Sequence, residues 1–261
     1  MQIEISGLSS PGAPVLVLSA GLGGLGSFWA PQRASLQARY RLVTYDHYGT
    51  GNNPATLPEP YSLQEMGREL ADALTAHGIQ RFSLLGHALG GLIGMQLAAD
   101  YPERVISLVV VNGWLTLNAH TRRCFRVRQD LLLNSGVEAF VRAQPLFLYP
   151  ADWLAAHQEQ AEAADSHHLQ HFQGTGNLLR RLSALMAADF SAIAAALTLP
   201  VLLIYSQDDL LVPWSCSLEL EAALPQAECI AMARGGHAMS VTCSEEFNQR
   251  LLPWLQQHAT V

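Results

Sequence analysis

The sequence of 261 residues contains no lysine, and all 15 of its basic residues are arginine. Catalysis through a lysine Schiff base is therefore excluded. Acidic residues number 22 and the net charge is −7, so we do not expect a nucleic-acid surface, which needs clustered positive charge. No apolar run approaches the roughly 18 residues that a membrane helix needs, so we expect no membrane partner.

Cysteine is also scarce, and its four occurrences show no Cys-x-x-Cys spacing: Cys124, Cys216, Cys229 and Cys243. No charged-then-apolar export signal opens the chain, so we expect reduced thiols in a cytoplasmic protein. Hydrophobic residues, by contrast, make up 49% of the sequence. That content is enough for a large buried core in one or two domains.

The most informative stretch is residues 84–91, LLGHALGG. An apolar run precedes it, a helix-like pattern follows, and Gly86 and Gly90 bracket the turn between them. This is the form of the nucleophile elbow G-x-S-x-G, whose middle residue occupies a strained corner at a helix N-terminus. Here the middle residue is Ala88, which has no nucleophilic atom. The sequence has the frame of a nucleophile site without the nucleophile.

Strand-like and helix-like segments alternate on both sides of this turn. Apolar runs at 14–20, 41–45, 105–111 and 200–205 predict buried strands, and a final short strand is expected at 227–232. Residues 63–77 have helical periodicity that ends at Gly78. This alternation predicts an α/β fold with a mostly parallel, doubly wound sheet. Residues 115–190 are helical in pattern only. We therefore expect a helical cap inserted between two late strands, over a core of residues 1–114 and 191–261.

The glycine-rich loop at 21–26 has two interpretations. With Asp46 about 20 residues later, its G-x-G-x-x-G pattern fits a dinucleotide fingerprint. Against this, the helix should begin within the glycines, whereas Pro31 best suits the first turn of a later helix. In the competing interpretation, the Leu22 N–H points into an active site and Asp46 bonds to the backbone of a turn.

Two later loops supply an acid and a histidine. Asp208 and Asp209 directly follow the strand at 200–205, on the ligand-binding edge of the sheet, and either could be the acid. His237 follows two glycines near the C-terminus, where core packing does not explain it, so we predict a catalytic role. The order elbow, acid, histidine is that of the α/β-hydrolases.

The cap contains two clusters of basic residues. Arg122, Arg123, Arg126 and Arg128 place at least two guanidinium groups on one helix face, either as a solvated surface or as a clamp for a substrate carboxylate; our candidates for the clamp are Arg122 and Arg123. The second cluster is His167, His168 and His171. No carboxylate or cysteine lies at matching spacing, so we expect an exposed helix and no metal. Cys243 has no partner in sequence that would make it a nucleophile.

The chain as a whole resembles the α/β-hydrolase superfamily, through residues 20–24, the elbow, Asp209 before Pro213, and Gly236-His237. The resemblance implies that Asp209 is the acid and that the N–H groups of Leu22 and Leu89 form the oxyanion hole. For His87 it leaves two roles open, a structural one and a direct one in catalysis or substrate binding. Cap segments 112–114, 118–125, 144–150 and 177–182 resemble a family of pyrimidine-utilisation hydrolases of uracil degradation, regarded as acting on aminoacrylate or carbamate. One departure is Tyr48, where the D-x-R-G turn of the superfamily often has arginine.

The missing nucleophile limits the chemistry. No acyl-enzyme can form, but an oxyanion hole and binding alone supply roughly 10³–10⁴-fold acceleration, which favours a labile substrate. Our hypothesis is water attack, in which Asp209 orients His237 and His237 transfers protons. Two alternatives stay open: an esterase or C–C bond hydrolase whose serine is replaced by Ala88, and a binding protein without catalysis. We expect a small-molecule ligand and no cofactor; a homodimer stays open, since hydrolase-like cores often form one.

Overall fold

The computed structural model describes residues 1–260. Its centre is a seven-stranded sheet in the order β1-β3-β2-β4-β5-β6-β7. The strands are β1 (Glu4–Gly7), β2 (Val15–Ser19), β3 (Arg41–Thr44), β4 (Phe82–His87), β5 (Val105–Val111), β6 (Val201–Ser206) and β7 (Glu228–Met232). Only β1 is antiparallel to its neighbour, and all other pairs are parallel. The predicted mostly parallel sheet is confirmed, with β1 as an additional antiparallel strand at its edge.

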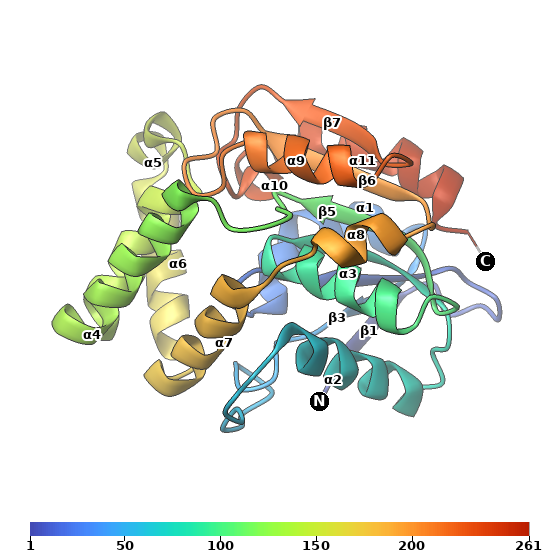
Figure 1. Ribbon diagram of the computed structural model, residues 1–261, viewed down its shortest axis with the longest axis horizontal. Coiled ribbons are helices and arrows are strands. Elements are labelled where there is room, and N and C mark those ends of the chain that lie inside the picture. The colour runs from blue at the N-terminus through green and yellow to red at the C-terminus, as the bar shows by residue number, and fades with distance from the viewer. Residues whose placement is uncertain (261) are drawn as a thin grey trace.

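Helices cover both faces of the sheet (Figure 1). One face carries α2 (Leu63–Ala76), α3 (Leu89–Asp100), α8 (Ser191–Ala196) and α9 (Ser215–Ala223). The other carries the short helix η1 (Gly26–Trp29), α1 (Ala30–Gln37), α10 (Met239–Thr242) and α11 (Ser244–His258). The central strands are therefore buried on both sides, which explains why they read as continuous apolar runs.

Helix α2 shows how local signals set its ends. The Ser62 hydroxyl accepts a hydrogen bond from the Glu65 N–H at 3.1 Å, a cap that satisfies one of the free N–H groups of the first turn. After Ala76, His77 leaves the helical conformation and Gly78 has φ +72°, a left-handed value that glycine adopts without strain. The helix predicted at 63–77 is confirmed, one residue shorter.

The chain leaves the sheet between β5 and β6 and forms the cap. Its helices are α4 (Ala119–Leu148), α5 (Ala151–Ala156), α6 (Gln158–Gln170) and α7 (Thr175–Ala187). They lie together at one side of the sheet in Figure 1, and α4 is interrupted at Gly136, where φ is +88°. An isolated antiparallel bridge between Thr116 and Asp189 joins the two ends of this insertion. The α/β-hydrolase fold with a helical cap between two late strands agrees with the sequence prediction.

Helix α7 holds the cap on the core through buried polar contacts. Arg181, which is fully buried, donates hydrogen bonds to the Tyr48 carbonyl at 2.6 Å and the Thr50 hydroxyl at 3.1 Å. Asn177 donates to the Ala55 carbonyl at 2.7 Å and accepts from the Leu57 N–H at 3.0 Å. Tyr48 stands where the superfamily often has an arginine. In this protein the turn is contacted by the guanidinium group of Arg181, from the cap.

Across residues 1–260, no helix combines the length and the apolar character needed to cross a membrane.

Candidate active site

Ala88 occupies the corner between β4 and α3 with φ +47° and ψ −110°. Residues with a side chain rarely adopt this conformation, and it persists only where the surroundings enforce it. Gly86 and Gly90 allow it, since a Cβ on Gly86 would collide with the Gly90 backbone and a Cβ on Gly90 with the Ser19 carbonyl oxygen. The strained elbow is present, with a methyl group at the position of the nucleophile.

His237 and Asp209 form a buried pair beside this elbow. The Nδ1–H of His237 donates to Oδ2 of Asp209 at 2.7 Å, and the two side chains are 3% and 0% exposed. The other carboxylate oxygen, Oδ1, accepts from the N–H groups of Leu211 (2.8 Å) and Val212 (2.9 Å). Because the carboxylate fixes the proton on Nδ1, the Nε2 of neutral His237 carries a lone pair and can accept a proton.

The neighbouring carboxylate, Asp208, has a different surrounding. Its Oδ1 accepts from the Ser206 hydroxyl at 2.6 Å and the Gly236 N–H at 2.8 Å, and its Oδ2 accepts from the Gly235 N–H at 3.2 Å. Asp208 therefore shapes the loop that carries His237, whereas Asp209 faces the imidazole. Of the two acids that the spacing allows, the structure brings Asp209 to the histidine.

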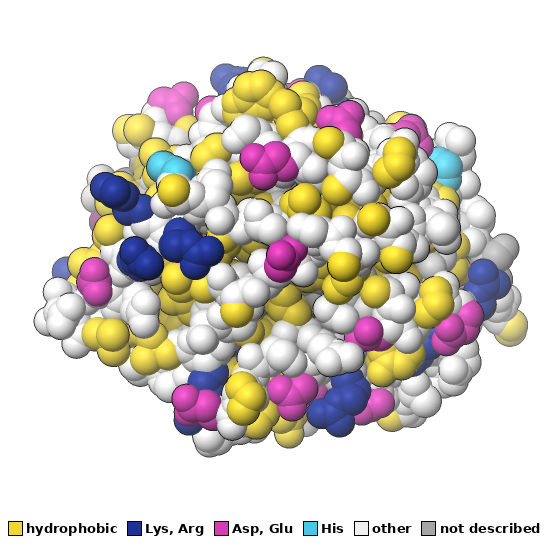
Figure 2. Space-filling view, viewed as in Figure 1, with side chains coloured by type: hydrophobic (Ala, Val, Ile, Leu, Met, Phe, Trp, Pro, Cys, Tyr) yellow, Lys and Arg dark blue, Asp and Glu magenta, His cyan; other side chains and the backbone are white. Residues whose placement is uncertain are grey.

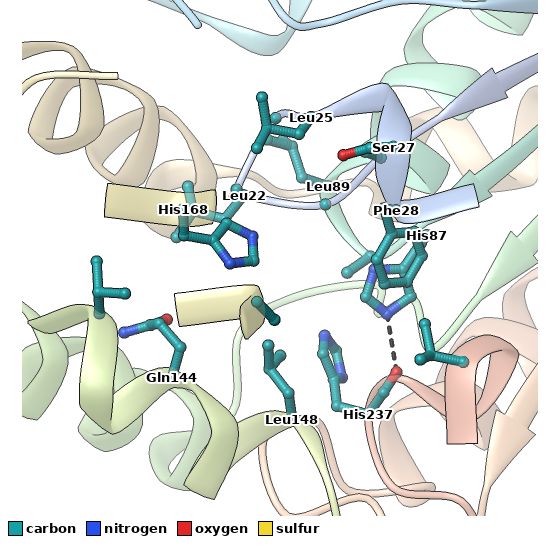
Figure 3. Close-up of a pocket in the computed structure, with 18 of the residues that line it drawn as sticks. Leu22, Leu25, Ser27, Phe28, His87, Leu89, Gln144, Leu148, His168 and His237 are labelled. Carbon is teal, nitrogen blue, oxygen red and sulfur yellow. Dashed lines mark hydrogen bonds between the residues drawn. The ribbon is translucent and has the colours of Figure 1, made fainter. Parts of the chain in front are cut away.

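Two side chains hold the backbone carbonyl of His237. The Nε2–H of His87 donates to it at 2.8 Å (Figure 3), and Nδ2 of Asn112 donates at 2.7 Å. Burial lowers the pKa of His87 well below its usual value, so the ring is neutral and its Nδ1 is a bare acceptor with no partner among residues 1–260. The ring of His87 stacks on Phe28 with centroids 4.6 Å apart. The geometry thus gives His87 a structural contact. Asn112 is a second support of the same loop, and its position in the sequence did not point to this part.

The proposed oxyanion-hole residues line the same cavity. Figure 3 shows Leu22 and Leu89 close to each other on its wall. Leu89 is the first residue of α3, where N–H groups have no partner within the helix and the helix dipole favours negative charge. Leu22 is fixed from the cap, because Gln173 Nε2 donates to its carbonyl at 3.1 Å. The Leu89 N–H thus lies at a helix N-terminus, a position suited to an anion. The part of the Leu22 N–H in an oxyanion hole stays a prediction.

The dinucleotide interpretation of the glycine loop is wrong. Both carboxylate oxygens of Asp46 accept backbone bonds at 2.9 Å, one from Gly26 and one from Asn52. The short helix η1 follows the glycines, and α1 begins only at Ala30, with Pro31 in its first turn. A fingerprint aspartate needs a free carboxylate for the ribose, and its helix starts within the glycines. Asp46 is the backbone-bonding turn residue of the competing interpretation.

A cavity of about 390 Å³ lies between the carboxyl ends of β2 and β4 and the cap. His87, Ala88 and His237 line it from the core. Most other wall residues are apolar or aromatic, including Phe28, Trp114, Phe125, Phe140, Trp153 and Phe172. The volume and the apolar wall are those of a small-molecule site.

The cap arginines are placed differently from our expectation. Arg122 is half-buried and Arg123 exposed, and neither lines the cavity. Figure 2 shows basic side chains gathered over α4, where Arg123 and Arg126 face solvent. Arg128 instead is buried and contributes to the cavity wall. The assignment of a clamp to Arg122 and Arg123 is corrected accordingly, because the direction of α4 on the core turns a different face inward.

The histidine cluster of α6 also differs from its expectation. All three rings contribute to the cavity wall, and His168 is half-buried and lies next to Leu22 in Figure 3, although His167 and His171 are exposed. Burial lowers the pKa of His168. Within residues 1–260, no group of three or more His, Cys, Asp or Glu side chains could hold a metal ion. Cys243 does not line the cavity.

Comparison with known proteins agrees with this architecture. The family described as the alpha/beta hydrolase fold matches residues 13–134. An enol-lactonase from Burkholderia xenovorans superposes with a TM-score of 0.89 over 98% of this chain and 96% of its own, at 23% identity. A hydrolase from Pseudomonas aeruginosa gives 0.86 over 97% and 93%, at 24% identity. At these identities the structures show the fold, and fold and site together define an α/β-hydrolase with alanine at the nucleophile position.

Sequence relatives are much closer. A protein of Enterobacter cloacae named "Putative carbamate hydrolase RutD" is 59% identical over 252 residues, which cover 97% of this chain and 95% of the relative. A Serratia proteamaculans protein of the same name is 56% identical over 255 residues, 98% and 96% of the two chains. The chain belongs to the RutD family of α/β-hydrolases, and it is a hydrolase.

Proposed function

We propose that this protein hydrolyses a small labile C–N compound of uracil degradation, 3-aminoacrylate or carbamate, and releases ammonia. The observation that carries the proposal is the buried His237–Asp209 pair beside an elbow whose nucleophile position holds only the methyl group of Ala88. A base with no nucleophile to activate is suited to activating water. The name of the relatives, carbamate hydrolase, points to the same bond type.

For carbamate, water adds to the carbon while Nε2 of His237 accepts its proton. The Leu22 and Leu89 N–H groups stabilise the negative charge that develops on oxygen. His237 then returns the proton to the nitrogen, the C–N bond breaks, and ammonia and bicarbonate are the products. Asp209 holds the imidazole in the required tautomer and stabilises the imidazolium that forms between the two steps.

For 3-aminoacrylate, the same groups transfer a proton to carbon. His237 passes a proton from water to the carbon next to the carboxylate, which converts the enamine to an iminium ion. The hydroxide left from that water adds to the C=N carbon, and ammonia leaves to give 3-oxopropanoate. In both reactions one water is consumed and one ammonia released, and no bond to the protein forms.

The size of the available acceleration decides the substrate class. A hydrolase site without its nucleophile retains roughly 10³–10⁴-fold acceleration. This is too little for a stable amide or ester, but sufficient for a compound that already decomposes in water.

The test is ammonia release from freshly generated 3-aminoacrylate and from carbamate, each with and without the protein, beside p-nitrophenyl acetate as an ordinary activated ester. We expect release above the spontaneous rate for one of the two C–N compounds and no more than slow turnover of the ester. If neither C–N compound is accelerated, the proposal fails. Rapid ester turnover would instead indicate a nucleophile elsewhere in the site.

A further inference from the structure

Arg128 is the single arginine, aspartate or glutamate among the described side chains that line the cavity. It is only 5% exposed. The remaining wall is apolar or carries hydroxyl, amide and imidazole groups, such as Gln144 and His168. The cavity therefore has one fixed charge, and that charge is positive.

The guanidinium group of Arg128 has no anionic partner. No Asp or Glu oxygen among residues 1–260 lies within ion-pair distance of it. Nη2 donates to the side-chain oxygen of Gln144, and Nε has no hydrogen-bond partner in the described part of the chain. The rings of Phe125, Phe140 and Phe147 surround Cζ at 5.5–5.8 Å. Three aromatic rings, the Gln144 amide and the nearby Cys124 thiol therefore surround the guanidinium group, and none of them carries a carboxylate.

Such a position is unfavourable for a cation unless a ligand completes it. Burial lowers the pKa of Arg128 to about 10, so the group is still charged at neutral pH. Cation–π contacts offset part of the lost hydration, but a buried charge is normally paired with an opposite one. A carboxylate could supply the missing charge and accept from the free N–H groups.

The other fully buried guanidinium of the cap provides a contrast. Arg181 donates to Tyr48, Thr50 and Gln173, and it does not line the cavity. Its contacts fix the cap to the core. Arg128 lacks such a set of acceptors, and its position in the cavity wall suits a ligand contact.

The size and shape of the cavity add a second constraint. Its volume of about 390 Å³ falls within the range of pockets that hold drug-sized ligands, whereas a carbamate ion is little larger than a few water molecules. In Figure 3, Gln144, the partner of Arg128, lies across the cavity from His87, and His237 lies between them. A ligand with a carboxylate near Gln144 and a body that reaches His237 would fill this space.

We propose that the cavity binds monocarboxylates with an apolar body, with Arg128 pairing with the carboxylate beside Gln144 and the aromatic wall packing around the body. This goes beyond the proposed function, because it concerns a larger class of ligand and does not depend on C–N bond hydrolysis. The smaller anions carbamate and 3-aminoacrylate can use the same guanidinium.

The test is calorimetric titration of the protein with three unreactive ligands. 3-Phenylpropanoate has the charge and the apolar body, its amide has the body alone, and propanoate has the charge with little body. We expect 3-phenylpropanoate to bind at least tenfold more tightly than either of the others. Equal affinity of the carboxylate and the amide would overturn the role of the charge, and equal affinity of propanoate would overturn the role of the body.

Two variants assign the charge to a residue. Arg128→Gln should lose the preference for carboxylate over amide by at least tenfold, while Arg123→Gln, an exposed arginine of the same helix, should keep it. An equal loss in both variants would contradict the assignment to Arg128. If Arg128→Gln does not fold, the comparison of the three ligands on the unaltered protein still decides whether the site selects such anions. Because these ligands do not react, the result is independent of whether ammonia is released from carbamate or 3-aminoacrylate.

Discussion

His87 and His237 are 150 residues apart in the chain and are joined by a hydrogen bond from the imidazole N–H of the first to the backbone carbonyl of the second, at 2.8 Å. Asn112 donates to the same carbonyl at 2.7 Å. His87 ends β4 and Asn112 follows β5, so neighbouring strands hold the loop that carries His237. The base is therefore held from two strands of the sheet, and the cap adds a third contact, because the Leu148 carbonyl accepts from the Ala238 N–H at 2.9 Å.

Replacing Asn112 should destabilise the protein in two separable ways. Its side chain also accepts from the Ser206 N–H at 3.0 Å, and its backbone has φ +50°. Asn112→Gly removes the hydrogen bonds but suits this φ, and we expect a loss of about 1–3 kcal/mol in the free energy of unfolding. Asn112→Ala adds the backbone strain, about 1 kcal/mol more. Urea unfolding measures both; an alanine variant as stable as the glycine variant would contradict the strain.

The two adjacent aspartates should respond differently to amide substitution. Asp209→Asn removes the carboxylate that orients His237, and we expect ammonia release to fall by about 10²–10⁴. Asp208→Asn weakens the hydrogen bonds that the backbone N–H groups of Gly235 and Gly236 donate to this side chain, so its main effect should be a lower melting temperature. The measurement is turnover beside thermal unfolding for both variants. Equal loss of turnover in the two would mean that the geometry does not separate their roles.

A serine at the elbow should acquire covalent chemistry. Ala88 has the strained conformation of a nucleophile position and lines the cavity with His237. We expect Ala88→Ser to show a burst of p-nitrophenol from p-nitrophenyl acetate, with one acyl group bound per molecule by mass spectrometry. The burst should disappear in the double variant that also carries His237→Gln. Absence of acylation in Ala88→Ser would show that a hydroxyl at this corner does not reach the base.

Features that depend on neighbouring residues in sequence could be predicted. Gly86 and Gly90 specify the elbow, because the backbone contacts that exclude a side chain there arise within the strand–turn–helix unit and its adjacent strand. The buried strands read as apolar runs because helices cover both faces of the sheet. His237 could be found because a histidine after two glycines has no packing role in the core.

Features that depend on how the cap packs on the core could not be predicted from the sequence. Arg122, Arg123 and Arg128 lie on one helix, and only the packing of α4 on the core decides which of them faces the cavity. The same holds for His168, whose neighbour His167 is exposed. The hydrogen bonds of Asn112 also could not be predicted, since its partners come from β6 and from the His237 loop.

Acid should destabilise the protein through its buried histidines. Burial, with a contribution from the charge of Arg181, lowers the pKa of His47 from 6.5 to about 3. The unfolded chain then binds a proton that the folded chain does not, so stability is fully present above pH 6.5 and is lost as the pH falls toward 3. Burial lowers the pKa of His87 in the same direction.

The slope of this loss approaches about 1.4 kcal/mol per pH unit for each such histidine. We therefore compare His47→Gln with His77→Gln, a variant at an exposed histidine. Between about pH 6 and pH 4, the unfolding free energy of His47→Gln should change with pH by about 1.4 kcal/mol per unit less than that of His77→Gln. Urea unfolding at each pH provides the values. Identical slopes for the two variants would mean that His47 accepts a proton in the folded state.

The most direct test of catalysis without a nucleophile compares ammonia release by the unaltered protein and by His237→Gln. The substrate is whichever of carbamate and 3-aminoacrylate the unaltered protein accelerates more. Each rate is measured against the spontaneous rate. Both proteins must first show the same circular dichroism, so that equal amounts of folded protein are compared. We expect acceleration by the unaltered protein and a fall of about 10²–10⁴ in the variant, the usual contribution of a general acid or base. Equal acceleration by both proteins would contradict this prediction, because water would then be activated by some group other than His237.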